Sequence, residues 1–319
     1  MRICIIGYGN IARSHIEAFR AHGCEIVASC NRSERGNESA RQEGGIPKTY
    51  TDHISMIETE KPDAVVNCVS FEHIFSITKS LIPFGIPLLI EKPAGLSVAE
   101  TKELIDLRNE FGTKVQVAMN RRHYSIFQNA INEIGGQDKI EMINLEWSES
   151  PLKAKTKKGL NDLLIGKYIY ANTIHGIDIL DYFSGGISDF QVYCSSSIGY
   201  FNWQMILSGK SKSGILVNFT SSWGSPVPWR LVIYGSNKRA EFSPLETCRI
   251  YSDSEPKVLS ISPKEFDTEL KAGFYMQSKI FLDLINSNEG ANTHGLESTL
   301  NGMLIAEGIY NELTLLINS

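Results

Sequence analysis

The first residues of the sequence carry a glycine pattern that can bind phosphate groups. An apolar run over residues 3–6 leads into Gly7-Tyr8-Gly9-Asn10-Ile11-Ala12, where a helical pattern begins. In a strand, turn and helix, Gly7 permits the tight turn, Gly9 lets a pyrophosphate approach the backbone, and Ala12 lets the helix pack on the strand. The amides and the dipole at the helix start favour a bound phosphate. The pattern predicts that a dinucleotide binds at Gly7, Gly9, Asn10, Ile11 and Ala12; a purely structural turn is the alternative.

Two further side chains suit the transfer of a hydride and a proton. Lys92 follows the apolar residues 88–90, at the carboxyl end of a predicted strand. A lysine there can hydrogen-bond a substrate hydroxyl and stabilise an alkoxide-like oxygen as hydride leaves. His175 lies in a helix predicted over residues 167–184, and a histidine, whose unperturbed pKa is near neutral, is suited to accept the hydroxyl proton. The alternatives are that Lys92 is a solvated surface residue and that His175 is a hydrogen-bonded structural residue. Judged by residue type alone, these non-catalytic interpretations are favoured for both positions.

Short apolar runs alternate with helical segments over residues 1–118. Strands are predicted at Arg2–Ile6, Glu25–Cys30, Ala64–Cys68, Leu88–Ile90 and Lys114–Ala118, with helices near 11–22, 33–44, 52–59, 72–84 and 97–111. This alternation implies right-handed crossovers and a doubly wound parallel sheet, which is an α/β fold. Ligands of such sheets lie beyond the carboxyl ends of the strands. Those ends are Gly7, Asn31, Ser70 and Glu91, followed by Met119-Asn120.

The end of the second strand bears on the form of the cofactor. An acidic residue there would hydrogen-bond a ribose 2′-hydroxyl and repel a 2′-phosphate, but the chain has Asn31-Arg32-Ser33. Because Arg32 can pair with a phosphate in a forked geometry, the segment favours NADP over NAD. A solvated Arg32, or one stacked on adenine, is the alternative, and the nearby Glu34 and Glu38 leave NAD open.

Strand-like segments dominate the second half of the chain. They are predicted at 138–148, 188–199, 202–209, 213–223, 228–236, 238–243 and 247–251, with helices near 274–287 and 296–316. The pattern predicts a large, mostly antiparallel sheet with few covering helices. Between the halves, residues 151–166 hold four lysines and are predicted as a solvated loop; contact with an acidic substrate is the alternative.

Composition narrows the class of protein. A net charge of −5 argues against nucleic acid or an anionic membrane as the main partner. No apolar run reaches the roughly 18 residues of a spanning helix, and a strand at residue 2 leaves no room for a signal peptide. Six scattered cysteines, without a CxxC pair or HExxH motif, predict a cytoplasmic protein without a metal site.

Several motifs together resemble the Gfo/Idh/MocA family of sugar and polyol oxidoreductases. They are the opening glycine motif, Glu91-Lys92-Pro93, Met119-Asn120-Arg121-Arg122, Ile174-His175-Gly176-Ile177-Asp178, Tyr234-Gly235-Ser236 and Gly273-Phe274-Tyr275-Met276-Gln277. The resemblance implies a Rossmann domain over residues 1–119 and an α+β domain over 120–319, which binds substrate. It also implies that the open sheet face forms a homodimer or homotetramer.

The resemblance also implies roles for particular residues. Lys92 and His175 would be catalytic, and the proline after Lys92 is often cis. Glu91 would orient Lys92. The cofactor would contact Gly7, Gly9, Asn10, Ile11, Ala12, Asn31, Arg32, Ser33, Ser70, Glu91 and Lys92, and the substrate Asn120, Arg122, Asn172, Asp178 and Tyr275.

One position departs from the family. An aspartate commonly lies one turn before the histidine, where this chain has Ala171. Asp178 lies on the other side of His175 and can supply a carboxylate. The departure leaves dinucleotide binding untouched but weakens the expectation of ordinary polyol dehydrogenation.

The preferred interpretation is an NAD(P)-dependent oxidoreductase that acts on a secondary alcohol or ketone of a sugar, sugar derivative or polyol. One alternative is transient oxidation on a retained cofactor, with elimination or hydrolysis and no net redox change. A second is a non-catalytic regulator that binds a dinucleotide, for which Ala171 is the sequence support.

Overall fold

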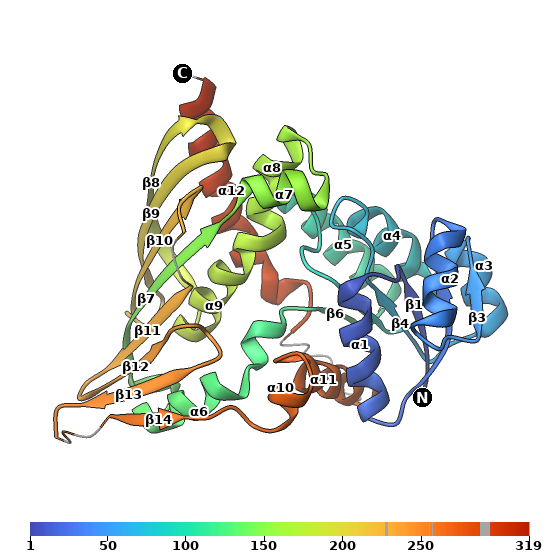
Figure 1. Ribbon diagram of the computed structural model, residues 1–319, viewed down its shortest axis with the longest axis horizontal. Coiled ribbons are helices and arrows are strands. Elements are labelled where there is room, and N and C mark those ends of the chain that lie inside the picture. The colour runs from blue at the N-terminus through green and yellow to red at the C-terminus, as the bar shows by residue number, and fades with distance from the viewer. Residues whose placement is uncertain (227–228, 255, 257, 288–293, 319) are drawn as a thin grey trace. The chain divides into compact units, whose positions relative to one another are not determined.

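The computed structural model describes residues 1–226, 229–254, 256, 258–287 and 294–318, and it divides the chain into two compact units (Figure 1). The Rossmann unit comprises residues 1–123 and 266–300, and the sheet unit comprises residues 124–265 and 301–319. Residues 266–300 therefore return to the first unit, which the single predicted boundary at residue 119 does not describe.

The Rossmann unit contains a six-stranded parallel sheet in the order β3-β2-β1-β4-β5-β6. Its strands are β1 (Arg2–Ile6), β2 (Glu25–Cys30), β3 (Lys48–Tyr50), β4 (Ala64–Asn67), β5 (Leu88–Ile90) and β6 (Val115–Val117). The order reverses between β1 and β4, and ligands of such sheets bind at that switch point. The predicted parallel sheet is confirmed. The short β3 was not among the predicted strands, because its three side chains are exposed or half-buried and form no apolar run.

The Rossmann unit also contains several helices. They are α1 (Asn10–Ala21), α2 (Glu34–Gln42), α3 (His53–Glu60), α4 (Ile74–Leu81), α5 (Val98–Phe111), α10 (Phe266–Glu269) and α11 (Phe274–Asn286), with 3₁₀ turns η1 (Ile82–Phe84) and η2 (Asn120–His123). The buried stripe of α1 runs along Ala12, Ile16 and Phe19, at helical spacing. Phe19 meets Phe281 of α11 edge to face, with ring centroids 6.1 Å apart. The returning segment thus completes the core around α1.

The sheet unit contains an eight-stranded sheet in the order β14-β13-β12-β11-β7-β10-β9-β8. The strands are β7 (Ile140–Glu149), β8 (Ile187–Ile198), β9 (Asn202–Ser211), β10 (Leu216–Trp223), β11 (Arg230–Gly235), β12 (Lys238–Phe242), β13 (Cys248–Ser252) and β14 (Leu259–Ile261). The pair of β7 and β10 is parallel and the other pairs are antiparallel, which confirms the predicted second sheet.

One face of this sheet packs against helices and the other lies bare (Figure 1). The helices of the unit are α6 (Ser125–Ile134), α7 (Pro151–Lys158), α8 (Asp162–Tyr168), the π-turn η4 (Ile169–Thr173), α9 (Ile174–Ser184) and most of α12 (Glu297–Asn318), with 3₁₀ turns η3 (Gln137–Lys139) and η5 (Gly199–Phe201). A Cβ at Gly176 would lie 3.0 Å from Leu145 of β7, so α9 is pressed onto the sheet at this glycine. Burial alternates along β9, as expected for a sheet with one covered face.

The lysine-rich segment 151–166 is helical, so its prediction as a loop was wrong. The Ser150 side chain accepts a hydrogen bond from the Lys153 amide and caps α7, with Pro151 in the first helical turn. The Asn161 side chain caps α8 in the same way. Capping residues and an amino-terminal proline are the local signals that favour helices here. Among the described residues, no helix is long and apolar enough to cross a bilayer.

Two mostly covered histidines face each other in the Rossmann unit. The rings of His123 and His294 meet edge to face, with centroids 4.8 Å apart. Burial, with the positive charge of Arg122 nearby, lowers the pKa of His123 to about 3 and that of His294 to about 4. Both side chains therefore stay neutral in the folded protein at pH values at which they are protonated in the unfolded chain.

We expect the free energy of unfolding to decrease as the pH falls below about 6.5, where the unfolded histidines bind protons and the folded ones do not. Between pH 7 and pH 5.5 the decrease should be roughly 1 to 3 kcal/mol, measured by urea unfolding. His123→Asn removes one of these groups and should show a smaller decrease; an equal decrease in both proteins would contradict the assignment.

Candidate functional site

The loop between β1 and α1 has the backbone that the glycine pattern predicts. Gly7 has φ +84°, and its N–H donates to the Cys30 carbonyl over 2.8 Å. A Cβ at Gly7 would lie 3.0 Å from the backbone of Cys68 and Val69, at the end of β4. Both the positive φ and the close approach require glycine.

Gly9 has no left-handed backbone conformation of the kind that Gly7 has, and its notable feature is the empty space around it. Its φ is −124°, and a Cβ there would meet no atom within 4 Å in the described part of the chain. Gly9 is the N-cap of α1, and among the described residues no side chain caps this helix. The start of α1 thus combines amides without a side-chain cap and open space at Gly9, which is an arrangement that can bind a phosphate.

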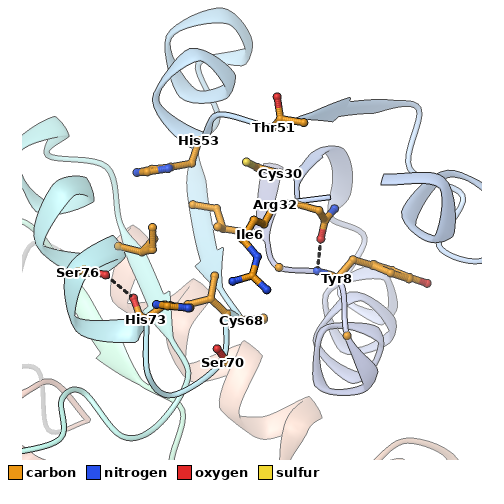
Figure 2. A pocket seen from close by; sticks show the side chains of 15 residues that line it. Ile6, Tyr8, Cys30, Arg32, Thr51, His53, Cys68, Ser70, His73 and Ser76 are labelled. Carbon is orange, nitrogen blue, oxygen red and sulfur yellow. Dashed lines mark hydrogen bonds between the residues drawn. The ribbon is translucent and has the colours of Figure 1, made fainter. Parts of the chain in front are cut away.

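A cavity of about 540 Å³ lies beside this loop (Figure 2). It is bounded by the carboxyl ends of β1, β2 and β4, by the start of α3 and by the first turn of α4. Its volume lies in the range of small-molecule sites. The predicted cofactor residues that line it are Gly7, Gly9, Asn31, Arg32 and Ser70. Thr51, His53, His73 and Ser76 also line it and were not predicted, since no motif marks them.

Asn31 at the end of β2 is used within the protein. Its Oδ1 accepts from the Tyr8 amide over 2.5 Å, and its Nδ2 donates to Ser29 Oγ over 3.0 Å and to Asn37 Oδ1 over 3.1 Å. The side chain is buried. Asn31 therefore ties the glycine loop to β2 and fixes the wall of the cavity.

Arg32 points into the cavity, between Ile6 and Ser70 in the view of Figure 2, whereas the Tyr8 ring points away from it. Its side chain is exposed to solvent. A guanidinium in this place offers several donors to an anionic group at the end of β2.

Glu34 and Glu38, the acidic residues that made NAD an alternative to NADP, form ion pairs with Arg41. Arg41 donates to Glu34 over 2.5 Å and to Glu38 over 2.8 Å, and its hydrogen bond lowers the pKa of Glu34. Ser33 accepts from the Gly36 amide and caps α2. Arg32 lines the cavity, and no Asp or Glu is among the described residues that line it.

Glu91, Lys92 and Pro93 follow β5 at the same edge of the sheet. Glu91 is buried, and its Oε1 lies 2.8 Å from Nε2 of His15 on α1. The His15 ring packs against Phe274, with centroids 4.8 Å apart. The peptide bond between Lys92 and Pro93 is cis, as the resemblance implied. Lys92 thus directly follows Glu91, whose carboxylate is held by His15 of α1. The sequence patterns did not predict a role for His15.

Two predicted substrate residues make contacts inside the Rossmann unit. Asn120 Nδ2 donates to the Ala272 carbonyl over 3.1 Å. Arg122 donates to Ser298 Oγ over 3.1 Å and to the Ser298 carbonyl over 2.9 Å. Both side chains are buried. These contacts attach the end of the parallel sheet to the returning segment.

Tyr275 lies in the first turn of α11. Its ring stacks on Phe266, with centroids 4.8 Å apart, and lies 4.2 Å from the ring of His22. Its carbonyl oxygen is 2.9 Å from Nε2 of His22. The aromatic contacts hold the start of α11 in the Rossmann unit.

The remaining predicted residues belong to the sheet unit. His175 and Asp178 are buried on α9, and the π-turn of residues 169–173 precedes them directly. Short π-helical segments such as this one are rare and often occur at functional sites. Ala171 is buried within this turn.

A carboxylate that was not predicted lies close to this turn. Oε1 of Glu149, the last residue of β7, accepts from Asn172 Nδ2 over 2.6 Å and from Trp147 Nε1 over 2.7 Å. Glu149 is 8% exposed. Asn172, which was predicted to bind substrate, lies three residues before His175 and thus orients the buried carboxylate of Glu149. The only signal in the sequence was an acidic residue at the end of a strand.

In the described ranges, no group of three or more His, Cys, Asp or Glu residues could hold a metal ion.

Comparisons with known proteins agree with this geometry. Residues 1–119 match a family described as an oxidoreductase family with an NAD-binding Rossmann fold, GFO_IDH_MocA. The match confirms the predicted resemblance for this part of the chain. Over the whole length, the structure of a Gfo/Idh/MocA family oxidoreductase from Vibrio cholerae superposes with a TM-score of 0.82 at 17% identity, covering 100% of both chains. That likeness confirms the two-sheet fold.

Two curated relatives match parts of the chain. A D-apiose dehydrogenase from Paraburkholderia graminis is 28% identical over 132 residues, which are 41% of this chain and 34% of that protein. A glycosyl hydrolase family 109 protein from Akkermansia muciniphila is 25% identical over 187 residues, which are 55% of this chain and 34% of that protein. The matched parts are thus about a third of each relative.

The two glycines make a matched pair for testing the loop. Gly9→Ala should change the free energy of unfolding by no more than about 1 kcal/mol, because its Cβ meets no atom of the described residues within 4 Å and Ala is only a poorer N-cap than Gly. It should weaken NADPH binding about tenfold or more by filling the phosphate position.

Gly7→Ala should instead lower the free energy of unfolding by roughly 1 to 3 kcal/mol, from its positive φ and its contact with β4. Urea unfolding and calorimetric titration measure the two effects. Unchanged NADPH affinity in Gly9→Ala would show that the phosphate does not bind at this loop.

Proposed function

We propose that this chain, whose residues 1–119 belong to the Gfo/Idh/MocA oxidoreductase family, transfers hydride between a nicotinamide dinucleotide and a secondary alcohol or ketone of a sugar, sugar derivative or polyol. The observation that carries the proposal is the glycine loop: Gly9 leaves space for a phosphate in front of the uncapped start of α1, beside a cavity of about 540 Å³. We place this activity in the cytoplasm.

In this proposal the bound dinucleotide supplies the hydride chemistry, and the protein supplies distance, orientation and charge. The amides after Gly9 hold the pyrophosphate, and Lys92 hydrogen-bonds the reacting oxygen of the substrate. His175 accepts or returns the proton of that oxygen. Lys92 and His175 belong to different units of the chain, so the proposal requires both units at one substrate.

We further infer that NADP(H) is preferred over NAD(H). Arg32 lines the cavity at the end of β2, whereas the acidic side chains of Glu34 and Glu38 pair with Arg41. A 2′-phosphate would therefore meet a guanidinium rather than a carboxylate.

The bare face of the large sheet supports self-association as a homodimer or homotetramer. Apolar side chains on β8, β9 and β10 are exposed there: Tyr193, Ile206 and Leu216 have exposed fractions of 65%, 52% and 52%. Large apolar side chains in such numbers on one face are typical of an interaction surface.

A second activity rests on the similarity to a glycosyl hydrolase family 109 protein. There the chain would oxidise a sugar carbon transiently, allow cleavage elsewhere on the ring, and reduce the carbon again without net redox change. A cofactor that copurifies and never exchanges during turnover would favour this activity over dehydrogenation.

Lys92→Ala should lower turnover about 100-fold or more, because the developing alkoxide-like charge loses its donor, while dinucleotide affinity stays within about threefold. The substrate for this measurement comes from a screen of sugars, polyols and their keto forms, read by nicotinamide absorbance. Lys79→Ala, which removes a surface lysine paired with Glu103 on the same unit, is the control. Normal turnover in Lys92→Ala would remove this residue from the chemistry.

Arg32→Ala should weaken NADPH binding about 10- to 100-fold, as expected for losing charge-assisted hydrogen bonds, and should change NADH binding by less than about threefold. Arg35→Ala is the matched control, since Arg35 is also exposed but does not line the cavity. Equal losses for both dinucleotides in Arg32→Ala would contradict a 2′-phosphate contact.

A further inference from the structure

A second cavity, of about 790 Å³, lies at the ends of two central strands of the large sheet, β7 and β10. The parallel strands β7 and β10 end together, since Glu149 pairs with Trp223 in their register. The cavity is lined by the last residues of β7, by the start of α7, by residues 224–226 after β10 and by Trp229 before β11. Every lining residue belongs to the sheet unit.

An aromatic residue is fixed at this cavity. Trp229 stacks on Trp147, with ring centroids 4.1 Å apart and 9° between the planes. Its Nε1 donates to the Ser148 carbonyl over 2.8 Å. Trp147 is completely buried, whereas Trp229 is half-buried and lines the cavity. The indole of Trp229 is therefore held rigidly by a stack and a hydrogen bond, which makes it a suitable flat surface for a ligand.

A carboxylate is fixed beside it. Glu149 lines the cavity, and two donors, Trp147 Nε1 and Asn172 Nδ2, hold its Oε1. These two bonds fix the orientation of a carboxylate, a group that accepts hydrogen bonds and donates none when it is ionised. Through Asn172 the acid is also attached to the helical segment that leads into His175.

A cation completes the lining. Lys153, in the first turn of α7, lines the cavity and is exposed. Lys155 of the same helix does not line it and pairs with Asp162 over 3.0 Å. The cavity thus combines an aromatic surface, an acceptor for hydroxyl groups and a positive charge.

We propose that this cavity is a carbohydrate subsite, in which Trp229 stacks on the C–H face of a pyranose ring and Glu149 accepts hydrogen bonds from ring hydroxyls. An apolar C–H face matches an indole, and neighbouring hydroxyls match the two oxygens of a carboxylate. Lys153 favours a ring with an anionic substituent, a carboxylate or a phosphate. The inference rests on the proposed function, because it gives the sugar its place on the sheet unit.

The test is saturation-transfer NMR on the full chain with three probes: glucose, glucuronate and glucose 6-phosphate. The anionic probes should bind the wild type at least about tenfold more tightly than glucose, with the strongest transfer to ring C–H protons. Trp229→Ala should abolish the signal, and Trp229→Phe should keep part of it. Glu149→Gln, which preserves size but removes charge, should weaken every probe about tenfold or more.

Lys153→Ala should reduce the anionic probes to the affinity of glucose, whereas Lys155→Ala on the same helix should leave all three unchanged. Comparing glucuronate with glucose 6-phosphate identifies which anion the site takes. If Trp229→Ala melts at a lower temperature than the wild type, Trp229→Phe and Glu149→Gln carry the test. The absence of a signal with all three probes would overturn the subsite, as would equal signals in the wild type and in correctly folded Trp229 and Glu149 variants.

NADPH binding, followed by fluorescence in the same samples, separates this inference from the proposed function. A wild type that binds NADPH but none of the sugars would refute the subsite alone. A wild type that does not bind NADPH would refute the proposed function, whatever the sugars do.

Discussion

The backbone at Gly7 is the constraint on which the proposed dinucleotide site depends. Its left-handed conformation turns the chain directly from β1 into α1, and its missing Cβ lets the turn lie against the end of β4. Because β1 and β4 flank the point where the strand order reverses, this close approach places the start of α1 over the switch point of the sheet. Asn31 then ties the same loop to β2. The absence of a side chain at Gly7 thus determines where the proposed phosphate site can form.

The same helix extends that constraint to the proposed chemistry. Buried polar groups are costly unless they are paired, and His15 of α1 pairs with the buried Glu91 that precedes Lys92. The packing of Phe274 against His15 brings the returning segment into this arrangement. The glycine loop at one end of α1 and the strand end at Lys92 are therefore positioned by one helix, as the proposed hydride transfer between a dinucleotide and a substrate would require.

Local patterns predicted both sheets and most elements, because apolar periodicity and glycine placement act over a few residues. They missed the short strand at 48–50, whose pairing depends on its neighbour, and the return of residues 266–300, which tertiary packing alone decides. They also predicted residues 151–166 as a loop, although capping side chains make two helices there. Glu149 and His15 escaped notice because each gains its place from a partner distant in sequence. Sequence motifs predicted the glycine loop as the cofactor site, whereas only the structure shows the burial and contacts of the side chains around that loop.

The most direct test of the account is a crystal structure of the full chain with NADPH bound. The account predicts the pyrophosphate on the amides that follow Gly9, the 2′-phosphate beside Arg32 in the cavity of about 540 Å³, and the nicotinamide ring next to Lys92 with His175 facing it. A glycine loop closed by protein atoms, or a nicotinamide ring remote from Lys92, would contradict it.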